Sequence, residues 1–337
     1  MDNTFDDKTI LVTGGTGSIG SEIVKQLLRK NISRVIVYSN EEIPNFLMSQ
    51  SIRDKRLEVI LGDVRDFQHL NNIFSKFNID YIYHAAALKH VVMCEKSPIE
   101  PVKTNILGTQ NLLDLAVEYD VSKTVFISTD KAVYPTNVMG ATKFIAERLV
   151  LNANDYAKKG QAFSCIRFGN VANSRGSVIP VLVDNMVNGL PFQITDRNVT
   201  RFTMEIEDAV NLILKATQLM DGGEIFVLKM RAYRLGDLVD AFIRVSRTLN
   251  YNNIIVEDVG LYPGEKLHEE LANSLELNNI YDCENMYVIL PQEKIPKKGY
   301  NKIVLKEYSS KTTDIMEGYE LDALILEYLE SKNIIKL

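Results

Sequence analysis

Two neighbouring residues of opposite charge, Asp130 and Lys131, are the clearest candidates for acid–base chemistry in this chain of 337 residues. They follow an apolar run, Lys123 to Ile127, which predicts a buried strand, and the two hydroxyl residues Ser128 and Thr129. A carboxyl group and an amine at the end of a buried strand can exchange protons with a bound molecule. We therefore expect Asp130, Lys131 and Thr129 to be catalytic. The alternative for the charged residues is a surface ion pair.

Glycine recurs at every third position, 14, 17 and 20, close to the start of the chain. An expected strand, Thr9 to Thr13, precedes these glycines and an expected helix, Ser21 to Arg29, follows them. Glycines between a strand and a helix permit a tight turn and let the backbone approach a pyrophosphate at the helix N-terminus. We predict a dinucleotide site here, with contacts from Gly14, Thr16, Gly17, Ser18, Ile19 and Gly20.

The next expected strands, Arg34 to Tyr38, Leu57 to Leu61 and Tyr81 to His84, end in further candidate contacts to the cofactor. The second strand, Arg34 to Tyr38, is followed by Ser39 and Asn40, then by two glutamates. An acidic residue here selects NAD and an arginine selects NADP, so the two neutral residues leave the nucleotide open. Glu41 or its neighbour is expected either to contact the ribose or to cap the next helix. Other expected cofactor contacts are Asp63, Val64, Ala85, Ala86, Lys89 and Asn105.

Polar residues beyond position 170 indicate a change from cofactor binding to substrate binding. Arginines far apart in the sequence, such as Arg175 and Arg201, can clamp a diphosphate, because guanidinium pairs bidentately with phosphate. The alternative for each arginine is an ordinary surface position. The expected substrate contacts are Lys89, His90, Asn170, Asn173, Arg175, Thr195, Arg201, Lys229 and Glu265.

Alternating strand and helix patterns predict an α/β fold, a Rossmann-type doubly wound parallel sheet with a smaller α/β C-terminal lobe. We expect residues 1–170 to bind NAD(P), residues of about 203–230 to return to that domain, and residues 171–337 to form mainly the substrate lobe. The net charge of −6 argues against a nucleic-acid partner. Three widely separated cysteines suggest neither disulfides nor a metal site. We expect a soluble cytoplasmic protein without membrane insertion.

Several motifs of this sequence occur in the same order in a known family. They are TGGTGSIG (13–20), GDVRD (62–66), HAAALKH (84–90), STDKAVYP (128–135), GATK (140–143) and PGEKLHE (263–269). With these motifs the chain resembles the extended short-chain dehydrogenases/reductases. More narrowly, it is similar to the nucleotide-sugar 4,6-dehydratases that act on UDP-N-acetylglucosamine with inversion at C5.

The resemblance implies a reaction in three steps with tightly bound NADP or NAD. C4 of the sugar is oxidised, water is eliminated across C5 and C6, and hydride returns to C6. Lys131 would be the base at C5 and Asp130, kept protonated by burial, the acid at C6. Reprotonation of C5 from the opposite face would come from Lys131 or another donor such as Lys89. NADP-binding members have Ser-Arg where this chain has Ser39-Asn40, so both nucleotides stay open.

Met139 stands where the family has a tyrosine that moves the proton of the C4 hydroxyl. A thioether cannot exchange a proton, so Thr129, Lys131 or Lys143 must substitute, and Lys143 would also hold the nicotinamide ribose. Methionine at this place resembles the dehydratase/5-epimerases of capsule and O-antigen synthesis. The resemblance further implies a homo-oligomer, with a hexamer as one form.

Three other functions remain compatible with the sequence. A 4-epimerase would share the fold but needs no Asp-Lys pair, and a retaining 4,6-dehydratase would differ only in the outcome at C5. A catalytically inactive protein that senses a dinucleotide would explain the missing tyrosine. Such a sensor, however, needs neither the Asp-Lys pair nor the polar substrate loops. Loss of turnover in Asp130→Asn would separate an enzyme from a sensor.

Overall fold

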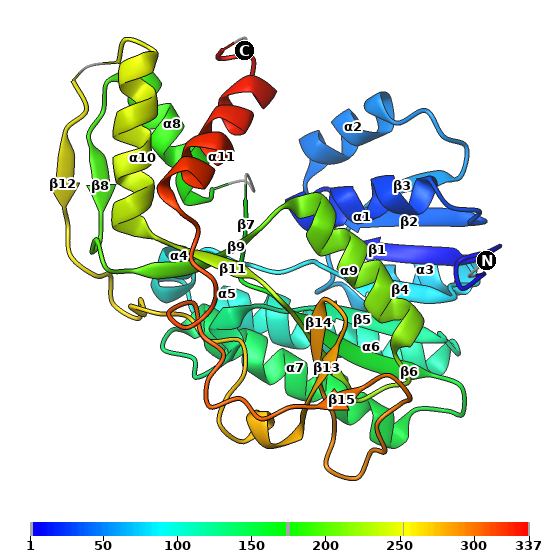
Figure 1. Cartoon of the computed structure of the whole chain (residues 1–337). Helices are drawn as coiled ribbons and strands as arrows, with labels where there is room; N and C mark the ends of the chain where they lie inside the picture. Colours follow the sequence, from blue (N-terminus) through cyan, green and yellow to red (C-terminus); the bar gives the residue numbers. More distant parts are fainter. Residues whose placement is uncertain (1–2, 173–175, 252, 336–337) are drawn as a thin grey trace.

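The computed structural model describes residues 3–172, 176–251 and 253–335 and is built around one large sheet (Figure 1). The strand order is β15-β13-β14-β10-β6-β5-β4-β1-β2-β3. The strands from β3 to β10 are parallel, whereas β14, β13 and β15 are antiparallel to their neighbours. The bounds are β1 (Thr9–Thr13), β2 (Arg34–Ser39), β3 (Leu57–Leu61), β4 (Tyr81–His84), β5 (Lys123–Ile127), β6 (Ala162–Arg167), β10 (Ile225–Leu228), β13 (Ile280–Cys283), β14 (Met286–Ile289) and β15 (Asn301–Lys302).

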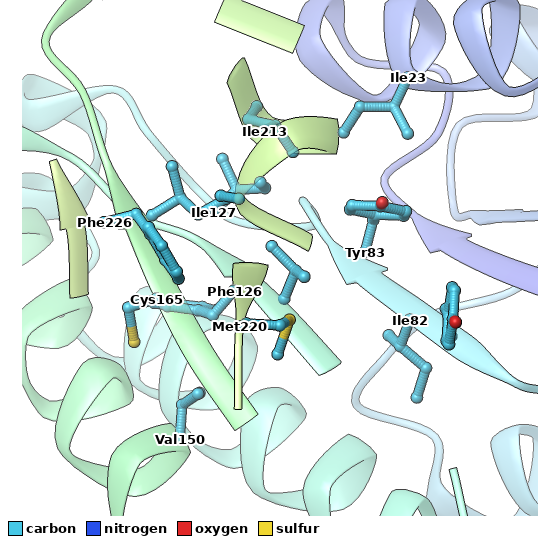
Figure 2. Packing of buried hydrophobic residues seen from close by; sticks show 14 of the residues in the cluster. Ile23, Ile82, Tyr83, Phe126, Ile127, Val150, Cys165, Ile213, Met220 and Phe226 are labelled. Carbon is cyan, nitrogen blue, oxygen red and sulfur yellow. The ribbon is translucent and has the colours of Figure 1, made fainter. Parts of the chain in front are cut away.

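Helices cover both faces of this sheet, which is why its central strands are apolar without alternation. Every residue of β6 and of β10 is buried. Figure 2 shows Phe126 of β5 with Ile213 on one side of the sheet and Val150 on the other. The covering helices are α1 (Ser18–Leu28), α2 (Glu42–Ser51), α3 (Phe67–Lys76), α4 (Val91–Lys96), α5 (Ile99–Pro101), α6 (Gly108–Glu118), α7 (Val138–Tyr156) and α9 (Ile206–Leu219).

A smaller α/β lobe with a separate hydrophobic core lies beside the carboxyl ends of the parallel strands (Figure 1). Its larger sheet has the order β11-β9-β7, and a second sheet pairs β8 with β12. Helix α10 packs against α11. The bounds are β7 (Asn170–Val171), α8 (Val178–Asn188), β8 (Phe192–Ile194), β9 (Thr200–Met204), β11 (Arg231–Arg234), α10 (Leu235–Thr248), β12 (Val256–Asp258) and α11 (Gly318–Ser331).

The Rossmann-type α/β fold predicted from the sequence is confirmed, and β1, β3, β4 and β5 have the predicted bounds. Two helices start elsewhere than the sequence predicts. The apolar pattern predicts a helix from Phe144 to Asp155, but α7 begins at Val138, because the side chain of Asn137 caps it. The pattern also predicts that Asn105 opens a helix from Ile106 to Tyr119, but Asn105 lies inside a π-helical segment, Val102–Leu107, that continues into α6.

The division of the chain at residue 170 stays a prediction. Strand β10 lies within the 203–230 span and pairs with β6 in the large sheet. The hairpin of β13 and β14 also joins that sheet, which the sequence did not suggest. Within the described ranges, no helix is long and apolar enough to cross a membrane.

Candidate active site

The Asp130-Lys131 pair is placed by backbone pairing that continues beyond the end of β5. Ser128 N donates to Ile166 O at 2.8 Å, and Asp130 N donates to Phe168 O at 3.2 Å. A short 3-10 turn, Asp130–Ala132, then bends the chain away from β6. Both charged residues therefore stand at the carboxyl edge of the parallel sheet, where ligands bind in this type of fold.

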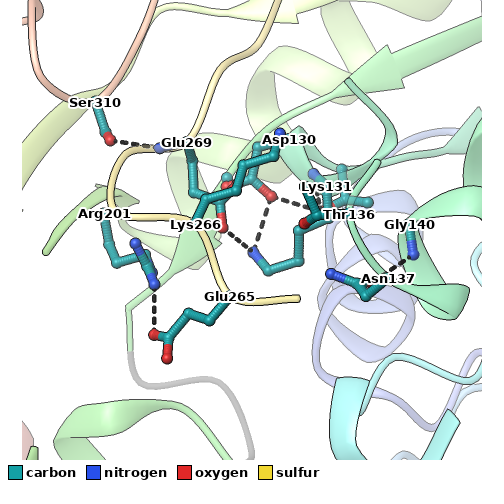
Figure 3. Close-up of polar contacts among 12 residues, drawn as sticks. Asp130, Lys131, Thr136, Asn137, Gly140, Arg201, Glu265, Lys266, Glu269 and Ser310 are labelled. Carbon is teal, nitrogen blue, oxygen red and sulfur yellow. Dashed lines mark hydrogen bonds and ion pairs between the residues drawn. The ribbon is translucent and has the colours of Figure 1, made fainter. Parts of the chain in front are cut away.

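Asp130 is fully buried and only one of its carboxylate oxygens is paired. Its Oδ1 accepts a hydrogen bond from Thr129 Oγ1 at 2.7 Å and another from Lys131 Nζ at 3.0 Å (Figure 3). Its Oδ2 has no partner among the described residues. A buried polar atom without a partner is costly, so Oδ2 is suited to meet a polar group of a ligand. The structure thus brings Thr129, Asp130 and Lys131 together.

A third ionisable residue, Glu269, lies next to Lys131 and comes from the segment between β12 and β13. Its Oε1 lies 3.6 Å from Lys131 Nζ, and its side chain is 4% exposed. Burial alone would lower the pKa of Lys131, but the carboxylates of Asp130 and Glu269 outweigh it and raise that pKa above its ordinary value. Sequence reasoning missed Glu269 as a site residue, although it ends the motif at 263–269.

Lys143 and Met139 are both buried and lie one turn apart on α7. Asn137 starts this helix, because its Oδ1 accepts from Gly140 N at 2.8 Å. Lys143 Nζ donates to Ile127 O at 2.6 Å, at the end of β5. Burial lowers the pKa of Lys143 to about 8, while nearby Glu147 partly opposes this effect. The Met139 side chain offers no hydroxyl, and its placement at the position of the family's tyrosine stays a prediction.

Glu147, Arg167 and Glu276 form a buried ion triad behind Lys143. Arg167 Nη2 lies 2.6 Å from Glu147 Oε2, and Arg167 Nη1 lies 2.7 Å from Glu276 Oε2. The side chains of Arg167 and Glu147 are fully buried and that of Glu276 is 11% exposed. The triad joins α7, the end of β6 and the segment that follows Glu269. No local sequence pattern predicted it, since its members are far apart in the chain.

The glycine segment forms a cradle that a side chain would fill. Gly14 has a φ of 63°, and a Cβ there would lie 2.7 Å from Ala86 Cα. A Cβ on Gly20 would lie 2.3 Å from Gly14 O. Helix α1 begins at Ser18, directly after the glycine turn, so the positive end of its dipole favours an anion at this place. The arrangement fits the pyrophosphate of a dinucleotide.

The end of β2 carries a carboxylate that faces this cradle. Thr16 Oγ1 donates to Glu41 Oε2 at 3.2 Å and lies 2.7 Å from Ser39 Oγ. Glu41 precedes α2 but its side chain does not cap that helix. Asn40 Nδ2 donates to Asp63 Oδ2 at 3.1 Å. Burial would raise the pKa of Asp63, but hydrogen bonds from Arg65 and Asn40 outweigh it and lower that pKa.

Asn105 fixes the segment that leaves β4. Its Nδ2 donates to Leu88 O and to Thr142 Oγ1, both at 3.0 Å, and its Oδ1 accepts from Leu88 N at 2.8 Å. The exposed residues Lys89 and His90 follow directly. A Cβ on Gly176 would lie 2.9 Å from His90 Cε1, so His90 lies beside Gly176. Ala85, Ala86 and buried Val64 line the remaining predicted cofactor edge.

Three of the predicted substrate residues form one cluster in the lobe. Glu265 Oε1 accepts from Arg201 Nη2 at 2.6 Å and from Thr195 Oγ1 at 3.2 Å (Figure 3). Asn170 begins β7 and pairs with Thr203 of β9. Lys229 is not part of this cluster, because its Nζ donates to Asp282 Oδ2 at 2.7 Å. Asn173 and Arg175 lie outside the described residues, so a clamp between two arginines stays a prediction.

Three features define the class of protein. They are a glycine cradle at a helix N-terminus, a Thr-Asp-Lys set with a buried Asp130 at the carboxyl edge of the sheet, and a smaller lobe with polar residues. They are the features of an extended short-chain dehydrogenase/reductase. A family model described as polysaccharide biosynthesis protein matches residues 10–291. The chain belongs to this family.

Related proteins cover nearly the whole chain. A Methanocaldococcus jannaschii protein, named as an uncharacterized membrane protein, is 44% identical over 97% of this chain and 98% of its own length. A Campylobacter jejuni UDP-N-acetylglucosamine 4,6-dehydratase (inverting) is 37% identical over 94% of this chain and 92% of that protein. The X-ray structure of Pen from Bacillus thuringiensis matches with a TM-score of 0.90, at 36% identity, over 96% of this chain and 98% of Pen.

Proposed function

We propose that this chain is a UDP-N-acetylglucosamine 4,6-dehydratase that inverts C5. Its product would be UDP-2-acetamido-2,6-dideoxy-beta-L-arabino-hexos-4-ulose, a precursor for surface polysaccharide. The observation that carries the proposal is the ion pair of buried Asp130 with Lys131, in which Asp130 Oδ2 has no partner among the residues that the structure describes. The related Campylobacter jejuni protein supports the choice of substrate.

Elimination across C5 and C6 needs a base for the C5 proton and an acid for the leaving hydroxyl. Lys131 Nζ and Asp130 Oδ1 are 3.0 Å apart, so both can face adjacent carbons of one sugar ring. We assign the base to Lys131 and the acid to Asp130, whose Oδ2 would carry the proton for the C6 hydroxyl. In this role Asp130 must carry a proton at the moment when the C6 hydroxyl leaves.

The residues around the glycine cradle would hold NAD(P). When bound there, the nicotinamide would take hydride from C4 and return it to C6. Lys143, at the end of β5, would bind the nicotinamide ribose. The Glu41 carboxylate beside Thr16 disfavours the 2′-phosphate of NADP, so we favour NAD as the resident nucleotide. Arg201, in the cluster with Glu265 and Thr195, would contact the diphosphate of the substrate.

The first test is the mass of the product formed from UDP-N-acetylglucosamine. We expect the wild-type protein to give a nucleotide sugar lighter by one water. Asp130→Asn removes the acid but preserves side-chain volume, so we expect its turnover to fall by about 10²- to 10⁴-fold with the melting temperature retained. A product of unchanged mass would indicate a 4-epimerase. Wild-type turnover by the Asn variant would exclude the assigned role of Asp130.

A further inference from the structure

Glu269 is held beside Lys131 by hydrogen bonds between its backbone and Ser310. Its backbone N donates to Ser310 Oγ at 2.9 Å, and its backbone O accepts from Ser310 N at 2.8 Å (Figure 3). Its side chain is 4% exposed, and its Oε2 has no partner among the described residues. Two buried carboxylates, Asp130 and Glu269, therefore flank one lysine, and each has an unpaired oxygen.

These groups are linked to one another by two hydrogen bonds and one ion pair. Thr129 Oγ1 lies 2.7 Å from Asp130 Oδ1, Lys131 Nζ lies 3.0 Å from that oxygen, and Glu269 Oε1 lies 3.6 Å from Lys131 Nζ. Arg201 also faces Lys131 and opposes its positive charge. Glu270 is the next acid along the chain, and it pairs instead with Lys266 at 4.0 Å.

Counting protons in the proposed reaction exposes a difficulty for Asp130 and Lys131 alone. Oxidation at C4 releases the hydroxyl proton, and loss of the C5 proton releases a second one. Departure of water consumes one proton, and reprotonation of C5 consumes the other. When the C4 proton has reached Asp130, Lys131 is still an ammonium and cannot act as the base. The reaction therefore needs a third group, besides Asp130 and Lys131, that can accept a proton.

We propose that Glu269 is this group, and that it stores the proton of Lys131 during each turnover. The inference rests on the proposed function. At rest only Lys131 carries a proton. The C4 hydroxyl proton moves to Asp130, and the NAD(P) of the proposed function takes the hydride from C4. Neutral Asp130 no longer stabilises the charge of Lys131, and Lys131 then gives its proton to Glu269. Neutral Lys131 then accepts the C5 proton while Asp130 protonates the leaving C6 hydroxyl.

The same three groups return to rest when hydride reaches C6. Lys131 or another donor protonates C5, and the proton stored on Glu269 restores the resting charge of the set. Every proton that leaves the substrate is thus consumed in the same turnover. Glu269 provides the proton capacity that a protein with Met139 in place of a tyrosine otherwise lacks.

Glu269→Gln tests this role, because glutamine keeps the shape of the side chain but cannot take the proton. Lys131 must then lose its proton to water, which becomes easier as the pH rises. We expect turnover of UDP-N-acetylglucosamine near neutral pH to fall by about 10²- to 10⁴-fold, and the remaining rate to rise about tenfold per pH unit. The wild-type rate should change little over the same range.

Two further variants separate proton storage from a structural effect. Glu269→Asp keeps a carboxylate, so it should retain the wild-type shape of the pH profile at a lower rate. Glu270→Gln, one residue away, should match the wild type in rate and profile. Thermal unfolding of all variants identifies any that fail to fold.

A Glu269→Gln variant with a wild-type profile, whatever its rate, would overturn the inference and leave the proposed function intact. Absence of water loss in the wild-type reaction would reject the proposed function, and the inference with it. A pH-dependent rise that appears in Glu270→Gln as strongly as in Glu269→Gln would also reject the role of Glu269.

Discussion

At the scale of single residues, the site combines neighbours in sequence with residues that only folding brings together. Thr129, Asp130 and Lys131 are consecutive, so their types and their position after a strand were enough to select them. Glu269 contacts Lys131 from a distant segment. Its selection needed the folded lobe, because nothing local distinguishes Glu269 from its neighbour Glu270.

Substitution of Met139 shows, at this scale, whether turnover needs a proton-transferring side chain on the first turn of α7. Met139→Leu conserves volume at a buried position and removes only the sulfur, and such swaps usually cost less than about 1.5 kcal/mol of stability. Because a thioether moves no proton, we expect turnover of UDP-N-acetylglucosamine to stay within about threefold of the wild type. Steady-state kinetics check this. A fall of about 100-fold would show that the sulfur itself contributes to catalysis.

At the scale of helices and strands, the sequence was informative wherever a strand is apolar throughout. Four parallel strands have their predicted bounds. Three of them, β1, β4 and β5, are buried almost throughout and give short apolar runs, whereas β3 is half-buried. Antiparallel β13, β14 and β15 were not predicted to extend this sheet. Their pairing with β10 depends on partners far away in the chain, which a local pattern cannot specify.

At the start of α7, one polar side chain both caps the helix and binds a distant loop. Asn137 caps the helix through Oδ1, while its Nδ2 donates to Gly264 O at 3.1 Å. Gly264 has a φ of 80°, and a Cβ there would lie 2.8 Å from Thr136 O. The capping residue was within reach of sequence analysis, whereas its second contact was not.

At the same scale, we expect a substitution in the buried triad of Glu147, Arg167 and Glu276 to lower the stability of the protein strongly. Arg167→Met would leave Glu147 and Glu276 facing each other without the guanidinium, and removing one partner of a buried ion pair costs about 3–5 kcal/mol. We expect the free energy of unfolding, measured by denaturant titration, to fall by about that amount.

Lys103→Met is the matched control, since it removes an exposed pair with Glu100. The side chains of Lys103 and Glu100 are 49% and 40% exposed, so its loss should cost about 0–1 kcal/mol. Equal losses of stability in Arg167→Met and Lys103→Met would contradict the structural role of the triad.

At the scale of the whole molecule, the loop that carries Glu265 and Glu269 is anchored on the segment that follows Asp130 and Lys131. Lys266 Nζ donates to Val133 O at 2.6 Å, and Tyr134 OH donates to Ser274 Oγ at 3.0 Å. These bonds join residues more than a hundred positions apart in the chain. They hold Glu265 and Glu269 near the carboxyl edge of the parallel sheet, so the position of these two glutamates depends on the segment at Val133 and Tyr134.

The prediction of two functional regions from sequence was useful but incomplete at this scale. The cluster of Thr195, Arg201 and Glu265 shows that polar residues chosen one by one can share a place in the fold. Lys229 was chosen by the same criterion but pairs with Asp282. Sequence alone cannot distinguish a basic residue of a polar cluster, such as Arg201, from one in an isolated ion pair, such as Lys229, because lysines and arginines are common on protein surfaces.

The most direct test of the central claim is proton NMR of UDP-N-acetylglucosamine with the purified protein in D2O, without added nucleotide. We predict a 4-keto-6-deoxy product with deuterium at an inverted C5, formed by resident NAD that can be identified after denaturation. Deuterated product with retained C5 would contradict the inversion and indicate a retaining dehydratase. UDP-N-acetylgalactosamine would indicate a 4-epimerase. Unchanged substrate, even with NAD or NADP added, would contradict the proposed activity.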